Sequence, residues 1–156
     1  MALAANGGTA SASSTYSGNF PVTAVNDGDR LGPNWGAGGG WNDGTVNVYP
    51  DWVQIDFSSS QTINEIDLFT LQDNYSSPVT PTLAMTFNQY GITDFQVQYW
   101  TGVAWADVPG GNVAGNRNVW RRFVFANITT SKIRVLVNNS FASYSRIVEI
   151  EVYRSG

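Results

Sequence analysis

The sequence predicts an all-β fold, an antiparallel β-sandwich or jelly roll of about eight strands. Several short segments, such as 52–57 and 94–100, alternate apolar and polar residues, and this period of two places one face of a strand against a core. Glycine-rich turns separate the segments, and apolar residues nowhere keep a period of 3.6 over more than a turn or two. Hydrophobic residues make up 42% of the 156 residues, enough for one packed core, so we expect a single domain over residues 1–156.

The predicted elements begin with an irregular lead-in, because residues 1–20 are mainly Gly, Ala, Ser and Thr without a period. Residues 27–49 form a long loop dense in Gly, Asn and Asp, and loops of this length are usually functional or organised by an ion. A second loop covers residues 72–89. Alternation predicts strands at 52–57, 63–71, 94–100, 120–125, 133–137 and 146–153. Four tryptophans on or next to these strands are expected in the core: Trp52, Trp100, Trp105 and Trp120.

Composition excludes several classes of function. Charged residues are only 13% of the chain, the net charge is −4, and the eight Lys and Arg residues are scattered, so no basic stripe is available for nucleic acid. The acidic, Gly-rich loops argue against insertion into an anionic membrane. The chain has no Cys and no His, which excludes zinc sites, Cys nucleophiles and His-based triads. Asp43 with Asp73 is the only carboxylate pair that we nominate for catalysis, and nothing in the sequence places the two at a catalytic separation.

The acidic turn Asn26–Asp29 is a candidate cation site. It is rich in oxygen ligands and contains Gly28, which can adopt the positive φ that wraps a chain round a hard cation. Near the other end of the chain, strand 146–153 carries Glu149 on a face otherwise occupied by Ile147 and Tyr153. If the two ends meet, one calcium ion accounts for both features. The alternative is a simple type I turn and a solvated strand face.

Five motifs follow one another along the chain. They are an acidic turn with a tryptophan loop after it, W-x-Q-x-D-F at 52–57, D-F-Q-V-Q-Y-W at 94–100, K-I-R-V-L-V at 132–137 and S-R-I-V-E-I-E-V-Y at 145–153. In this order they resemble the discoidin (coagulation factor C-type) domain of the galactose-binding-like superfamily, over residues 5–154. Bacterial domains of this kind are family 32 carbohydrate-binding modules.

The resemblance implies a discoidin-like jelly roll whose termini are close together, with a structural calcium ion near one rim and a ligand site in the loops at one end. The positions that it assigns to the ion are the carbonyl of Ala24, the side chain of Asp27, the carbonyl or side chain of Asp29, and Glu149, with the carbonyl of Val148 as a neighbour. Where the family often supplies a Ser or Thr after the turn, this chain has residues 32–34, Gly-Pro-Asn, so the remaining ligands stay open.

Sugars are bound by an exposed aromatic ring together with Asn, Asp, Gln or Arg side chains, because a sugar offers an apolar C–H face and hydroxyl groups. Three loops carry suitable sets: Trp35, Trp41, Asn42 and Asp43 in the first, Gln72, Asp73, Asn74 and Tyr75 in the second, and Phe141, Tyr144 and Arg146 in the third. The family's galactose binders commonly use a His and an Arg-Asn pair. This chain lacks the His and reads Leu71-Gln72-Asp73-Asn74 in that region, so the identity of the sugar does not carry over.

The sequence therefore predicts a non-catalytic carbohydrate-binding module with a structural calcium ion, which binds glycan through its rim loops. We expect it to be one module of a larger secreted, bacterial protein that it targets to polysaccharide. The alternative is a discoidin-type adhesion or protein-binding domain, and a polysaccharide-active enzyme is the least favoured class.

Overall fold

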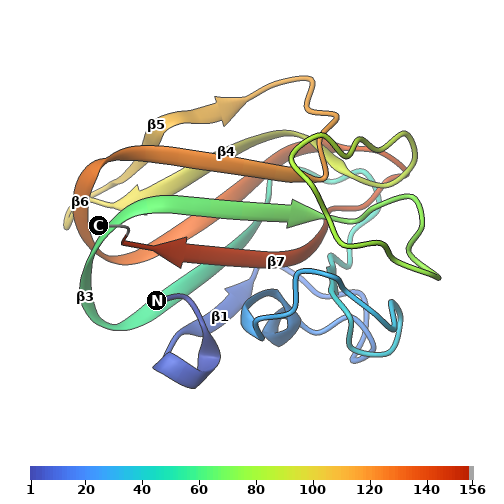
Figure 1. Ribbon diagram of the computed structural model, residues 1–156, viewed down its shortest axis with the longest axis horizontal. Helices are drawn as coiled ribbons and strands as arrows, with labels where there is room; N and C mark the ends of the chain where they lie inside the picture. Colours follow the sequence, from blue (N-terminus) through green and yellow to red (C-terminus); the bar gives the residue numbers. More distant parts are fainter. Residues whose placement is uncertain (155–156) are drawn as a thin grey trace.

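The prediction of an all-β antiparallel fold is confirmed by the computed structural model, which describes residues 1–154 (Figure 1). The strands of this part of the chain are β1 (Thr9–Ala12), β2 (Trp41–Asn42), β3 (Asp51–Thr70), β4 (Ile92–Trp100), β5 (Trp105–Val113), β6 (Trp120–Ser140) and β7 (Arg146–Tyr153). Two short 3-10 helices precede β2: η1 (Ala4–Asn6) and η2 (Val22–Asn26). The strands form one sheet in the order β2-β7-β3-β6-β4-β5, and β1 pairs with the first half of β3.

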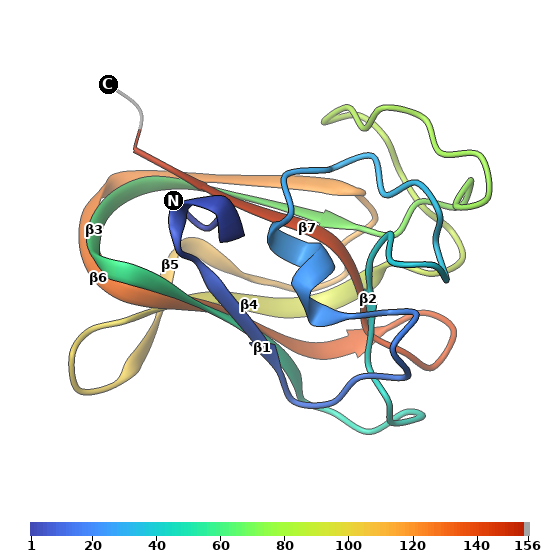
Figure 2. The ribbon, with the colours of Figure 1, turned by 90° about the horizontal axis from the view of Figure 1, so that it is seen from below.

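Two long strands fold this sheet into two layers. β3 and β6 pair over almost their full lengths and curl together at one end of the molecule (Figures 1 and 2). Their register shifts between Asp56 and Gln61, where three exposed serines, residues 58–60, form the bend. The segments predicted as separate strands at 52–57 and 63–71 are therefore one strand, and so are those at 120–125 and 133–137.

The core lies between the two layers, and the alternation of the sequence places it there. Val53, Ile55 and Phe57 of β3 face inward, as do Phe95 and Val97 of β4. The tryptophans do not follow our expectation. The four expected in the core are only partly buried, and the fully buried tryptophan is instead Trp41.

The first twenty residues are not the irregular lead-in that their composition indicates. β1 pairs antiparallel with residues 53–56 of β3, and Ala2 is buried in the core. The side chain of Asn26 donates hydrogen bonds to the carbonyls of Ala2 (2.9 Å) and Gly8 (3.1 Å). The terminal amine of Met1 donates to the carbonyl of Val152 at 3.0 Å, so the N-terminus lies beside the last strand.

The long loops gather at the end of the molecule opposite the bend in β3 and β6, on the right in Figures 1 and 2. They are the segments 13–40, 71–91 and 141–145, and we call this end the rim. The β4–β5 turn lies at the other end (Figure 2). Neither helix in residues 1–154 is long and apolar enough to cross a membrane.

Candidate functional site

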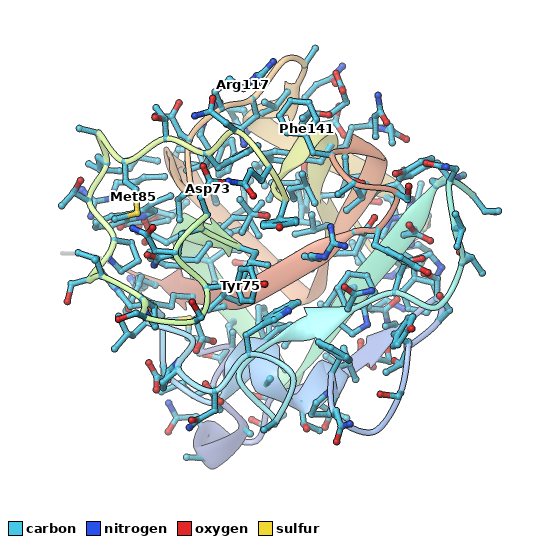
Figure 3. All side chains as sticks on the ribbon, turned by 90° about the vertical axis from the view of Figure 1, so that its right-hand side faces the viewer. Asp73, Tyr75, Met85, Arg117 and Phe141 are labelled. Carbon is cyan, nitrogen blue, oxygen red and sulfur yellow. The ribbon has the colours of Figure 1, made fainter. Side chains whose placement is uncertain are left out.

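A cleft of about 420 Å³ opens at the rim, which faces the viewer in Figure 3. Loops from three distant parts of the sequence form it, together with the start of β7. Its lining residues are Tyr16, Phe20, Trp35, Gly36, Asn42, Leu71, Tyr75, Tyr90, Tyr144 and Arg146.

One wall of the cleft is a chain of aromatic rings in mutual contact. Tyr16 lies edge-on to both Phe20 and Tyr144, with ring centroids 5.6 Å apart in each pair. Phe20 in turn contacts Trp35, at 5.2 Å between centroids. Edge-to-face pairs of this kind add stability beyond the apolar area that they bury, so the loops hold one another in place.

A second wall is formed by Tyr75 and Tyr90, which meet edge to face at 5.4 Å. The guanidinium of Arg146 lies over the ring of Tyr90 at 5.3 Å and over that of Tyr144 at 5.4 Å. Arg146 therefore connects the two walls through cation–π contacts.

Arg146 is held at the start of β7 by three hydrogen bonds to uncharged oxygens. Its Nε donates to Oδ1 of Asn42 at 2.9 Å, and its terminal nitrogens donate to the carbonyls of Phe141 and Ala142, each at 3.3 Å. Burial lowers the pKa of Arg146 from its ordinary value, because the desolvated cation has lost part of its hydration. The three hydrogen bonds fix the orientation of the guanidinium in the cleft.

Two buried carboxylates brace the loop that precedes Arg146. Asp43 accepts hydrogen bonds from the backbone N–H groups of Ser145 (2.7 Å) and Thr45 (2.9 Å). The hydroxyl of Ser145 donates to Asp51 at 2.7 Å. Burial raises the pKa of Asp51 to about 6, and the neighbouring charge of Asp43 acts in the same direction.

Of the residues predicted to bind ligand, the structure brings a subset together in the cleft: Trp35, Asn42, Tyr75, Tyr144 and Arg146. Sequence reasoning missed the other five lining residues, which are Tyr16, Phe20, Gly36, Leu71 and Tyr90. The available signal was the presence of Tyr16 and Phe20, two large aromatic residues in a segment otherwise made of small ones.

Trp41 and Asp43 lie elsewhere than we expected. Trp41 is fully buried in the core, and its indole N–H donates to the carbonyl of Ser14 at 3.0 Å, so it presents no face to a ligand. Asp43 is also fully buried, with its oxygens occupied by the loop that it braces. Both residues support the rim loops through these hydrogen bonds and do not face a ligand.

The remaining predicted residues lie outside the cleft. The side chain of Gln72 is buried and bonds to both the N–H and the carbonyl of Val79. Asp73 accepts backbone hydrogen bonds within its own loop, and Asn74 is exposed in the next turn. Figure 3 shows Phe141 close to Arg117, away from Tyr75, and the Arg117 guanidinium lies 4.4 Å from the Phe141 ring centroid.

The acidic turn does meet Glu149, beneath η2. Glu149 is fully buried and neither of its carboxylate oxygens has a hydrogen-bond partner. Burial first, and then the neighbouring carboxyl group of Asp27, raise the pKa of Glu149 to about 10. Ile147 packs in the core, so it does not share the face of Glu149 as the strand pattern predicts, because the pairing of β7 with β3 has a bulge that skips Val148.

This arrangement fits a hard cation. Buried polar atoms almost always have partners, and here two carboxylate oxygens lack them beside a second carboxylate. No group of three or more His, Cys, Asp or Glu side chains with metal-site geometry occurs in residues 1–154, so backbone carbonyls would have to complete the coordination. One carboxylate oxygen of Asp29 is already used in a hydrogen bond, because its Oδ1 accepts the N–H of Leu31 at 3.0 Å.

Comparisons with solved structures show the same fold. A chitosan-binding module of a chitosanase/glucanase from Paenibacillus sp. IK-5 is 20% identical, with a TM-score of 0.69 and 94% of each chain covered. The family 32 carbohydrate-binding module of NanJ from C. perfringens, solved with galactose, is 17% identical, with a TM-score of 0.67 and coverage of 94% of this chain and 93% of that one. SpGH29 is 19% identical with a TM-score of 0.71, and the match covers 99% of this chain but 28% of that chain.

A search of the curated proteins finds no match to the chain. The family model of the F5/8 type C domain matches residues 9–150, from the first strand to the last. The order of the five sequence motifs predicts this result. The chain belongs to the F5/8 type C, or discoidin, domain family.

Proposed function

We propose that this domain is a non-catalytic carbohydrate-binding module whose glycan occupies the rim cleft. The observation that carries the proposal is the cleft itself, which combines aromatic walls with the donors and acceptors of Arg146 and Asn42. Aromatic rings bind the C–H face of a sugar, and amide and guanidinium groups bind its hydroxyls. Sugar sites need this combination in an open, preformed hollow.

The similar structures support the same class of ligand. One is named as a chitosan-binding module and another was solved with galactose. The first derives from a chitosanase/glucanase, and the chain covers only part of SpGH29. Partial coverage of SpGH29 supports a module within a larger protein, and we propose that this protein is secreted, bacterial and targeted to polysaccharide by the module.

We further propose that calcium occupies the site beneath η2. Glu149 and the side chain of Asp27 would supply charged oxygens, and the carbonyls of Ala24, Val148 and Asp29 are the neutral candidates. The ion would neutralise the buried carboxylate and tie the acidic turn to β7. Its role would be structural, because the rim cleft has its own, separate set of residues.

Binding in the cleft should be weak and reversible. An open site on loops desolvates few contacts, so we expect a Kd of roughly micromolar to millimolar, or about −4 to −8 kcal/mol. Neighbouring modules in one protein would raise retention through avidity.

The test is a glycan array followed by calorimetry on variants of the two walls. Tyr75→Ala and Tyr144→Ala should each weaken binding of the best array ligand by about tenfold, because each removes a ring from the cleft. Trp105→Ala is the matched control, since Trp105 is a partly buried aromatic that begins β5, directly after the β4–β5 turn at the end of the molecule opposite the rim. If both tyrosine variants bind like the wild type, the cleft is not the glycan site. A blank array would favour the adhesion or protein-binding alternative.

A further inference from the structure

Arg146 is a cation without a counter-anion. It is the only charged side chain among the described residues that line the cleft. Within residues 1–154, ion pairs with carboxylates are made by Arg30 and Arg122, and none by Arg146. A partly buried charge normally has a partner of opposite sign, because burial removes the water that would otherwise stabilise it.

The hydrogen bonds of Arg146 leave part of its donor capacity free. A guanidinium has five N–H groups, and three hydrogen bonds to Asn42, Phe141 and Ala142 are formed. All three acceptors are neutral oxygens. They fix the plane of the group and leave one N–H on each terminal nitrogen for a ligand.

Asp43, the carboxylate whose charge acts on Arg146, does not take this role. Asp43 acts on Arg146 only at a distance, and its oxygens accept hydrogen bonds from Ser145 and Thr45. The cleft therefore holds a fixed, incompletely neutralised guanidinium between aromatic walls.

Resting on the proposed glycan function, we propose that the preferred ligand is an acidic glycan whose carboxylate or sulfate binds Arg146. The N–H groups that remain free can donate to the oxygens of such an anion, and charge-assisted hydrogen bonds of this kind are about twice as strong as neutral ones. The rings of Tyr90 and Tyr144 lie next to the guanidinium, so a sugar ring on the aromatic wall would bring its acidic substituent to Arg146.

The same argument predicts which glycans are disfavoured. No Asp or Glu among residues 1–154 lines the cleft, so an ammonium sugar such as glucosamine would meet a like charge and no anion. The preferred ligand is therefore negatively charged, whereas chitosan is a polymer of amino sugars, which carry positive charge.

The experiment compares sugars that differ only at one substituent. The probes are the methyl glycosides of glucose, galactose and mannose, their uronic acids, the methyl esters of these acids, the 6-sulfates of glucose and galactose, and glucosamine. Titrations of the full chain are followed by amide chemical shifts of the rim loops. We expect at least one uronic acid or 6-sulfate to bind about tenfold tighter than its parent hexose, and the methyl ester to lose that gain. The uronate and sulfate arms distinguish the two sources of the anion.

Variants then assign the preference to one side chain. Arg146→Gln should bring the acidic sugar to the affinity of the neutral one, and Arg146→Lys should restore only part of the preference, because lysine keeps the charge but lacks the planar fork. Arg134→Gln is the matched control, since Arg134 lies on β6 outside the cleft and bonds to Gln98. The comparison of acid and ester in the wild type needs no variant, so it tests the proposal even if an Arg146 variant fails to fold.

The outcomes separate this inference from the proposed function. If neutral sugars bind in the cleft as tightly as acidic ones, the acidic preference is wrong and the glycan function remains. If the acidic sugars do not bind at all while neutral array glycans do, the preference is equally wrong. If neither class binds to the array or in titration, the glycan function itself fails.

Discussion

At the scale of single residues, Asp51 and Asp43 are two buried acidic side chains whose proximity lowers the stability of the folded state. Both side chains are almost fully buried, and together they hold Ser145 in the loop before Arg146. Burial disfavours the charged form of Asp51 and the neighbouring Asp43 adds to this effect, so Asp51 retains its proton to a higher pH than in the unfolded chain. The two carboxyl groups therefore hold the loop beside the cleft in place, but they lower the free energy of unfolding near neutral pH.

This loss of stability predicts a pH dependence that one substitution should remove. The pKa of Asp51 is raised from 3.8 to about 6 in the folded state, so its stabilising protonation is fully present below pH 3.8 and is lost as the pH rises through 6. Asp51→Asn keeps an acceptor for Ser145 without the charge. We expect it to raise the Tm at pH 7 by about 2–8 °C, corresponding to about 1–2 kcal/mol, with little gain at pH 4.

Thermal melts of both proteins across pH 4–7 measure this difference directly. Asp56→Asn is the control, because Asp56 is exposed on the same strand. A gap in Tm between wild type and Asp51→Asn that stays constant with pH would contradict the assignment.

At the scale of elements, the acidic turn after η2 and strand β7 are two halves of one contact. Glu149 brings a buried carboxyl group without a hydrogen-bond partner and Asp27 a second acidic group, so the ionised form of Glu149 is strongly disfavoured without a cation. The stability of this region should therefore depend on calcium more than that of any other part of the sheet.

Removing calcium with a chelator should lower the Tm of the wild type by several degrees, because a ligand that binds only the folded state stabilises it by mass action. Glu149→Gln should abolish the response to added calcium, since the neutral amide no longer supplies a charged ligand. Asp73→Asn, a change at an acidic loop residue outside this site, should keep the full response. Identical melting curves with and without chelator would exclude a calcium ion at this site.

The elements also show what the sequence could and could not predict. Alternation located the buried faces of β3, β4 and β6, because a sheet with one face on a core leaves a period of two in the sequence. It could not show that 52–57 and 63–71 are one strand, since the exposed serines between them read as a turn. β1 was missed because its Thr-Ala-Ser-Ala sequence is small and polar, and only the free edge of β3 makes it a strand.

The candidate site was predictable only in part, for a similar reason. Loop residues such as Trp35, Tyr144 and Arg146 were found by their chemistry, which needs no knowledge of packing. The choice between Trp41 and Trp35 depended on which ring the fold buries, and that is a tertiary property. Tyr16 and Phe20 join the cleft from a segment of mostly small residues, where two large aromatic rings were the only signal and their position depends on the fold.

At the scale of the whole molecule, the aromatic residues form two groups with different roles, one in the core and one in the cleft. Rings inside the sheet stabilise the fold, and rings at the rim face the ligand, while the two-layered sheet holds loops distant in sequence at one end (Figures 1 and 2). The site should therefore tolerate changes at the opposite end of the molecule.

This separation predicts that attachments at the chain ends leave binding unchanged. A fluorescent protein fused through a flexible linker to Gly156 should alter the Kd for the best array ligand by less than about twofold, because β7 carries the chain away from the rim. Calorimetry on the fused and free domains measures this. A tenfold loss of affinity would indicate that the ends of the chain contribute to the site.

The hydrogen bond from the Met1 amine to Val152 has a consequence for how such modules combine. β7 starts at the cleft with Arg146 and runs to Tyr153, a span of roughly 25 Å for a strand of this length, so Met1 and the end of β7 lie beside each other on the side of the domain away from the cleft. If several such modules followed one another in one protein, each would be attached to the connecting chain at the end opposite its cleft. Every cleft could then face away from the connecting chain. In such an array, spacing along the tether, rather than contact between neighbours, would decide how many sugars of one polysaccharide are held at once.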